Sequence, residues 1–202
     1  YKEDTMNPAT VVKLFVTPSK GWKEVVKKSP PVHQLFIFYV VPLALIPSLI
    51  IGHADQTPAW EILKLLNPRS LPLVGAALFV IQLIVVAMMA IVMRQLADLA
   101  ETKVSFKSAF TLAAICPTPL WLSAIALLIP SSLLVIAAVC LAMMASVGLM
   151  YYGVPEIYKL RNQGQSMLLF GGILIAGVVA MGFLMVATLV IWGSLQNLTI
   201  AS

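Results

Sequence analysis

The sequence predicts an all-α integral membrane protein with five transmembrane helices, a cytoplasmic N-terminus and an exterior C-terminus. Hydrophobic residues make up 60% of the 202 positions and charged residues only 10%, whereas about a quarter of an ordinary soluble domain is charged. Mean hydropathy is +0.98. The apolar residues form five runs of about 17 residues or more, the length that crosses a bilayer. The predicted spans are 35–52, 72–93, 108–129, 133–154 and 167–192, which together make one membrane domain over 35–193.

The orientation follows from the distribution of Lys and Arg. Eleven of them precede the first span or follow the second and fourth spans, and only Lys64 and Arg69 lie on the other side. The positive-inside rule then places the N-terminus in the cytoplasm and the uncharged tail, 194–202, outside. The basic residues that give the net charge of +5 are spread over several short segments. This spread does not suit a phosphate-binding face, so no nucleic-acid partner is expected.

A basic lead-in over 6–34 precedes the first span. Tyr1 to Thr5 come before the first methionine, Met6, and we interpret them as added residues outside the native start. Thr17 and Pro18 predict the start of a short helix. Trp22 lies on one face of this helix, and the lysines predicted to contact the membrane surface are Lys20, Lys23, Lys27 and Lys28. The helix either lies in the headgroup layer, anchored by Trp22 on anionic lipid, or packs on the cytoplasmic end of the bundle.

Prolines interrupt two of the predicted spans. The first span contains Pro42 and Pro47, so we expect it to bend. The third contains Pro117 and Pro119, which deprive the carbonyls of Ala113 and Ile115 of their helix donors. Such carbonyls need partners inside a bundle, and the candidate donors are Thr111, Thr118, Ser123 and, from the second span, Gln82. Gln82 itself is interpreted first as a helix–helix contact and second as a substrate contact.

The last two spans carry small residues at every fourth position, which favours close helix packing. The two packing stripes are Ala138, Ala142 and Ser146, and Gly172, Ala176 and Ala180. Tyr151, Tyr152 and Trp192 are expected at the membrane interfaces. Between the first two spans, an apolar pattern predicts a short surface helix that contains Trp60, Ile62, Leu63, Leu65 and Leu66.

No catalytic residue, metal site or cofactor is expected. Cys116 and Cys140 both fall in apolar spans and are interpreted as small buried hydrophobic residues. His33 and His53 flank the first span without a carboxylate or thiol at a metal-ligand spacing. Since no Asp, Glu, Lys, Arg or His lies within a predicted span, an ion-coupled pump is disfavoured.

Three segments resemble the Yip1 family and, more narrowly, its bacterial inner-membrane branch. They are LFVTPSKGW (Leu14 to Trp22), AFTLAAICPTPLWLSAIALLIP (Ala109 to Pro130) and YYGVP (Tyr151 to Pro155). The resemblance implies a multi-pass protein of the bacterial inner membrane, or of the Golgi or ER membrane if the source is eukaryotic. Eukaryotic members associate with prenylated Rab GTPases and carry a long cytosolic N-terminal region. Only about thirty residues precede the first span here, so the Rab-binding role is not carried over.

These observations favour a non-enzymatic scaffold or assembly and trafficking factor that acts through helix–helix and lipid contacts. Its expected partners are the lipid bilayer, anionic lipids, and either a second copy of the chain or other membrane proteins. The alternative is an uncoupled permeation path for a small or lipidic solute between the proline-broken first and third spans. An intramembrane enzyme is the least favoured class, because no nucleophile and base, or carboxylate pair, share one depth.

Overall fold

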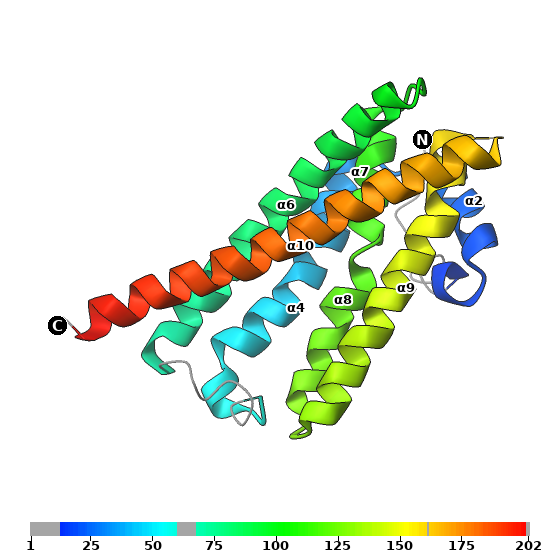
Figure 1. The fold of residues 1–202 in the computed structure, drawn as a ribbon. Coiled ribbons are helices and arrows are strands. Elements are labelled where there is room, and N and C mark those ends of the chain that lie inside the picture. The colour runs from blue at the N-terminus through cyan, green and yellow to red at the C-terminus, as the bar shows by residue number, and fades with distance from the viewer. Residues whose placement is uncertain (1–12, 60–67, 161, 201–202) are drawn as a thin grey trace.

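Five helices long and apolar enough to cross a membrane form a bundle in the computed structural model, which describes residues 13–59, 68–160 and 162–200 (Figure 1). No strand occurs in these ranges. The spans are Val32–Gly52, Leu71–Leu99, Phe106–Leu128, Ser132–Tyr158 and Gln163–Ser194. The predicted fold class and the number of spans are therefore confirmed. The orientation across the membrane stays a prediction.

The first span contains a π-helical turn. It consists of α3 (Val32–Leu35), the π-helix η1 (Phe36–Val40) and α4 (Val41–Gly52). The N–H of Val41 donates to the carbonyl of Phe36, five residues back. Pro42 follows directly and has no N–H to donate, so the wider turn lies where the proline interrupts the α-helical pattern. Pro47 lies inside α4.

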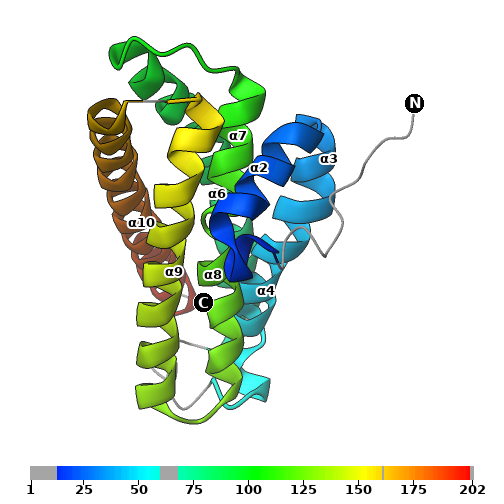
Figure 2. The same ribbon diagram turned by 90° about the vertical axis from the view of Figure 1, so that its right-hand side faces the viewer.

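The lead-in forms the helix α2 (Pro18–Lys28), which packs across α9 on the outside of the bundle (Figure 2). It ends at Ser29, whose φ of 44° is left-handed and whose N–H donates to the carbonyl of Val25. This is a common way for a helix to satisfy its last carbonyls.

The second span, α6 (Leu71–Leu99), contacts α4, α7 and α10. It continues past the predicted limit of 93, with Arg94 and Asp98 exposed on its last turns. The short 3-10 helices η2 (Ala54–Gln56) and η3 (Pro68–Ser70) flank the connection before it. The surface helix predicted at Trp60 to Leu66 lies outside the described residues.

The third span is broken as predicted. Its first half, α7 (Phe106–Ile115), begins at Ser105, whose hydroxyl accepts from the N–H of Ser108 at 3.2 Å. Cys116 and Pro117 form a turn, and the chain continues as α8 (Thr118–Ser123) and the 3-10 helix η4 (Ala124–Leu128). The fourth span is α9 (Ser132–Tyr158), and the fifth is α10 (Gln163–Ile200), which crosses α6 at the edge of the bundle (Figure 1).

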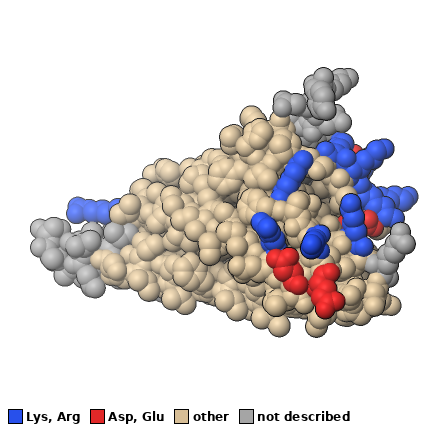
Figure 3. All heavy atoms as spheres, turned by 90° about the horizontal axis from the view of Figure 1, so that it is seen from above, with Lys and Arg blue, Asp and Glu red and all other residues tan. Residues whose placement is uncertain are grey.

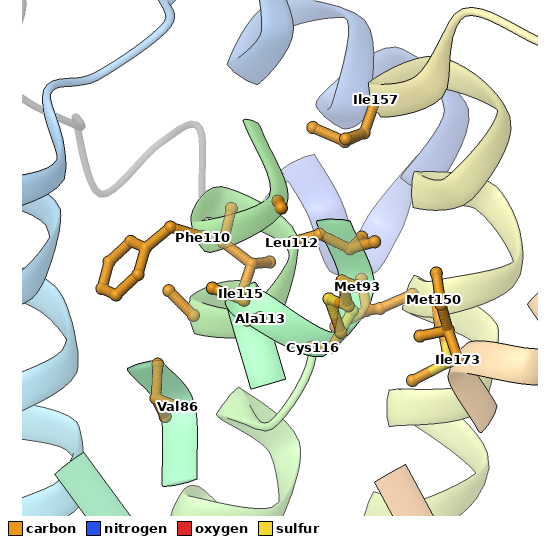
Figure 4. Close-up of a cluster of buried hydrophobic side chains, with 14 of the residues drawn as sticks. Val86, Met93, Phe110, Leu112, Ala113, Ile115, Cys116, Met150, Ile157 and Ile173 are labelled. Atoms are coloured by element: carbon orange, nitrogen blue, oxygen red, sulfur yellow. The ribbon is translucent and has the colours of Figure 1, made fainter. Parts of the chain in front are cut away.

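The core is centred on α7. In the third span, 50% of the apolar segment is buried inside the protein, whereas in the fifth span only 6% of the corresponding segment is buried. Ile115 and Cys116 at the end of α7 lie among Met93 of α6, Met150 of α9 and Ile173 of α10 (Figure 4). The broken span is therefore the one that the other helices surround.

Candidate functional site

The breaks in the first and third spans lie side by side. Tyr39, in the π-turn, and Thr118, the first residue of α8, share a hydrogen bond of 2.8 Å between their hydroxyl oxygens. Tyr39 is 9% exposed and Thr118 only 1%. Pro119 is also buried and Pro117 is half-buried. The structure thus brings together Pro117, Pro119 and Thr118 with the π-turn that precedes Pro42, while Pro47 lies further along α4.

The other donors predicted for this break bond elsewhere. Thr111 donates to the carbonyl of Lys107 at 2.8 Å, and Ser123 donates to the carbonyl of Leu120 at 2.8 Å, both within their own helical segments. Gln82 was expected as the donor from another span, and this expectation is wrong. Among the described residues, the side chain from another span that bonds at the break is that of Tyr39, which lies in the π-turn and shares its hydrogen bond with the hydroxyl of Thr118.

Gln82 instead joins α6 to α4. Its side-chain amide donates to the hydroxyl of Ser48 at 3.1 Å and to the carbonyl of Leu78 at 3.2 Å. Ser48 in turn donates to the carbonyl of Ala44 at 2.9 Å. A Cβ atom on Gly75 would lie 2.5 Å from the carbonyl oxygen of Ser48, so only glycine permits this approach of α6 to α4. The contact matches the first interpretation of Gln82.

Trp22 is not a membrane anchor. Its side chain has no exposed surface, and its indole N–H donates to the carbonyl of Leu149 in α9 at 3.0 Å. A Cβ atom on Gly153 would lie 2.7 Å from Cε2 and Cζ2 of the indole, so the missing side chain of Gly153 provides the space for the ring. A buried indole with a satisfied N–H is a stable packing unit. The lead-in helix therefore packs on the bundle, as the second interpretation expected, and the contact of its lysines with anionic lipid stays a prediction.

The lysines of α2 divide into two groups. Lys20 and Lys27 are exposed. Lys23 lies 3.8 Å from a carboxylate oxygen of Glu156 in α9, and Lys28 lies 3.2 Å from Glu24 in α2 itself. A helix held by Trp22 thus presents Lys20 and Lys27 outward.

Charged side chains gather at one end of the bundle, which we call the basic end (Figure 3). It comprises α2 with the residues just before it, the last turns of α6, the connection to α7 with the start of that helix, and the end of α9 with Lys159. In the described ranges it carries nine basic and four acidic residues. The basic ones are Lys13, Lys20, Lys23, Lys27, Lys28, Arg94, Lys103, Lys107 and Lys159, and the acidic ones are Glu24, Asp98, Glu101 and Glu156.

The two predicted packing stripes are buried to different degrees. Ala142 and Ser146 of α9 are buried and Ala138 is half-buried. Gly172, Ala176 and Ala180 of α10 are all half-buried. A Cβ atom on Gly172 would lie 3.5 Å from Cδ2 of Leu96, an ordinary contact between α10 and α6. The stripe of α9 therefore faces the protein interior more fully than the stripe of α10.

The cysteines and histidines lie apart from these contacts. Cys116 is buried as expected, but Cys140 is exposed on the outer face of α9, so its predicted burial is wrong. Both histidines are exposed, and Nδ1 of His53 lies 3.1 Å from the carbonyl of Leu49. Among the residues that the structure describes, no three His, Cys, Asp or Glu side chains could hold a metal ion together.

Three residues that position these contacts were not singled out from the sequence. Tyr39 and Tyr158 each carry a buried hydroxyl, and that of Tyr158 donates to the carbonyl of Met93 at 3.0 Å. A tyrosine inside an apolar run signals that its hydroxyl needs a partner. The contact between Gly153 and the Trp22 indole could not have been recognised from the sequence, because it depends on tertiary structure.

Comparisons with known proteins identify the family. A family model described as the Yip1 domain matches residues 12–193, nearly the whole chain. No curated protein and no solved structure matches the chain.

Proposed function

Because the chain belongs to the Yip1 family, we propose that this multi-pass membrane protein is a non-enzymatic scaffold for membrane assembly or trafficking. It would hold its partners through the basic end and through helix packing. The expected partners are anionic lipids and other membrane proteins, a second copy of the chain included. The bacterial inner membrane is the proposed location, or the Golgi or ER membrane for a eukaryotic source.

One observation carries the scaffold proposal: α2 is fixed to the bundle by Trp22, which is fully buried and hydrogen-bonded to α9. The exposed Lys20 and Lys27 therefore lie on a helix with a fixed position. A preorganised charged face loses less conformational entropy on binding than a flexible tail. Its charge complements acidic protein segments and the anionic inner leaflet.

The interior polar groups support a non-enzymatic function. Gln82 and Ser48 join α6 to α4, Tyr39 and Thr118 join the two breaks, and Tyr158 joins α9 to α6. Each of these three contacts joins two helices, and Gln82 and Ser48 also donate to carbonyls of their own helices, whereas the buried hydroxyl of Ser146 has no partner among the described residues. A catalytic group would need a polar atom directed at a substrate instead.

Site-specific photo-crosslinking in native membranes tests the scaffold function. A crosslinking residue at Ser19, exposed on α2, is compared with one at Leu73, exposed at the opposite end of α6. We expect discrete protein adducts from position 19 that weaken in Lys20→Gln/Lys27→Gln and at high salt. Arg69, which is exposed before α6 and lies outside the basic end, supplies the control Arg69→Gln, which should leave the adducts unchanged. The same adducts from both positions, or adducts indifferent to both lysines, would refute the proposal.

A second candidate, the uncoupled permeation path, is favoured by the adjacency of the two breaks at Tyr39 and Thr118. Interrupted backbone at membrane depth is tolerated where it is buried in protein or lines a water-filled cavity, and the adjacent breaks meet the first condition in this structure. A path would require the buried hydrogen bond between Tyr39 and Thr118 to open. The test measures flux of a small solute across proteoliposomes. Flux that is higher for Tyr39→Phe than for the unchanged protein, and absent from empty vesicles, would favour permeation over the scaffold.

A further inference from the structure

A hollow of about 280 Å³ lies between the end of α9 and the start of α10. In Figure 1 these two ends meet at the basic end of the bundle. Six side chains define its chemistry. They are Tyr151 and Tyr152 of α9, Asn162 in the connection, and Gln163, Ser166 and Phe170 of α10.

One wall of the hollow is aromatic. The ring of Tyr151 meets that of Phe170 edge to face, with centroids 5.5 Å apart, and meets that of Tyr152 in the same way at 5.4 Å. Each pair at this distance and angle is a favourable aromatic contact, so the three rings hold one another in place. Tyr151 is 47% exposed and Tyr152 is 43% exposed, which leaves their surfaces accessible from outside.

The opposite rim is polar and uncharged. The side-chain oxygen of Asn162 accepts from the N–H of Gly164 at 2.9 Å, which leaves the NH₂ group of the amide as the donor for a ligand. The amide of Gln163 and the hydroxyl of Ser166 follow on the first turn of α10. None of the described residues that line the hollow carries a carboxylate.

We propose that this hollow binds the headgroup of an anionic glycerophospholipid. The phosphate would accept hydrogen bonds from Asn162, Gln163 and Ser166, and the glycerol backbone would lie against Tyr151 and Phe170. The volume is at the lower end of the range for ligand sites, about 300–1,000 Å³, and suits a headgroup rather than a whole lipid.

The location and the charge select this ligand over others. Tyrosines at the end of an apolar span lie at the depth of lipid headgroups. The basic end, with nine basic and four acidic residues in the described ranges, attracts anionic lipid to that depth. Lys159, exposed at the end of α9, adds a cation next to the connection that contributes Asn162. The inference rests on the part of the proposed function that names anionic lipids as partners. No residue of α2 lines the hollow, so loss of the Ser19 adducts and loss of lipid labelling are separate outcomes.

The test uses the full chain in phosphatidylcholine nanodiscs that contain a minor fraction of photoactivatable phosphatidylglycerol. Labelled peptides are mapped by mass spectrometry. The variant Gln163→Ala/Ser166→Ala removes the side-chain hydrogen-bond donors of two residues. We expect the labelling of the α9–α10 hairpin to fall by about fivefold for each donor that is lost. Ser166→Trp, which fills the hollow, should abolish it. Gln165→Ala is the matched control, because Gln165 is exposed on the same turn of α10 but does not line the hollow.

Competition identifies the source of the phosphate. Unlabelled phosphatidylglycerol should suppress the labelling, and neither sodium phosphate nor diacylglycerol should do so. Suppression by sodium phosphate would mean a site for a free anion, and suppression by diacylglycerol would mean apolar contact only. Either result overturns the proposal, as does equal labelling of Gln163→Ala/Ser166→Ala and Gln165→Ala. Thermal melting of each variant in detergent shows that it is folded, and if Ser166→Trp does not fold, the donor-deleted variant alone decides.

Discussion

Gly153→Ala should loosen α2 from the bundle. The new Cβ atom would lie 2.7 Å from two atoms of the Trp22 indole and 2.6 Å from Cδ1 of Leu112. The Leu112 methyl group can move, but the indole is rigid and fully buried. Overpacking of this kind costs about 1–3 kcal/mol. It is partly offset by the higher helix propensity of alanine, worth about 1 kcal/mol.

Gly148→Ala is the matched control on the same helix. Nothing lies within 4 Å of a Cβ atom at this position, so only the gain in helix propensity remains. Gly148→Ala should therefore raise the melting temperature slightly. The free energy of unfolding of Gly153→Ala should be lower than that of Gly148→Ala by about 1–3 kcal/mol, because of the overpacking. Trypsin cleavage after Lys23 and Lys27, followed by mass spectrometry, should accelerate only in Gly153→Ala.

A double-mutant cycle with Trp22→Phe separates this contact from a general effect of the substitution. Phenylalanine lacks the indole atoms that the new methyl group would meet, so Gly153→Ala should cost less in the Trp22→Phe background. The expected coupling is about 0.5–3 kcal/mol. Additive effects, or equal melting and cleavage of Gly153→Ala and Gly148→Ala, would refute the reasoning.

Four further predictions concern the spans. Gly75→Ala should lower the melting temperature through an overpacking cost of about 1–3 kcal/mol, since the methyl group would meet the backbone of α4; an unchanged melting temperature would contradict this. Tyr39→Phe should destabilise by about 1–3 kcal/mol, because it leaves the Thr118 hydroxyl buried without its partner, and Tyr39→Phe/Thr118→Val should recover part of the loss in the same melting assay. Pro117→Ala/Pro119→Ala should keep the fold but lose the adducts from Ser19 if the break positions α2, and full retention of those adducts would limit the break to packing. Reporter fusions should place the N-terminus in the cytoplasm and the C-terminus outside, and a cytoplasmic reporter at the C-terminus would contradict the basic asymmetry.

The spans and their breaks were predictable because they depend on local chemistry. Apolar runs of membrane length need no tertiary information, and a proline removes its hydrogen bond wherever it lies. Span limits were less accurate for a related reason. The helix α6 continues through Arg94 and Asp98 to Leu99, because a helix ends where its hydrogen bonds end and not where its apolar run does.

The partners of the polar side chains were not predictable in the same way. Trp22 lies 127 positions from its acceptor, Leu149, and an indole facing lipid or protein gives the same amphipathic pattern in α2. Gln82 was correctly expected to join helices, but the choice of Ser48 over the break near Pro117 depends on how α4 lies against α6. The residue type indicates that a partner is needed, and only the packing decides which one.

The interior hydrogen bonds also indicate which part of the bundle can move. Trp22, Tyr39, Gln82 and Tyr158 tie α2, the π-turn, α4, α6, α8 and α9 to one another through buried contacts. In α10, by contrast, the hydroxyls of Thr188 and Ser194 donate to carbonyls of their own helix. Only 6% of the apolar segment of this fifth span is buried inside the protein. The helix α10 packs along α6 and α9 without a hydrogen bond to either from these side chains, and a helix held by apolar packing alone is displaced at a lower free-energy cost than one tied by buried hydrogen bonds. A lipid at the α9–α10 hollow, or a partner at the basic end, should therefore act on the structure by shifting α10 against α6, and not by separating α7 from the helices around it.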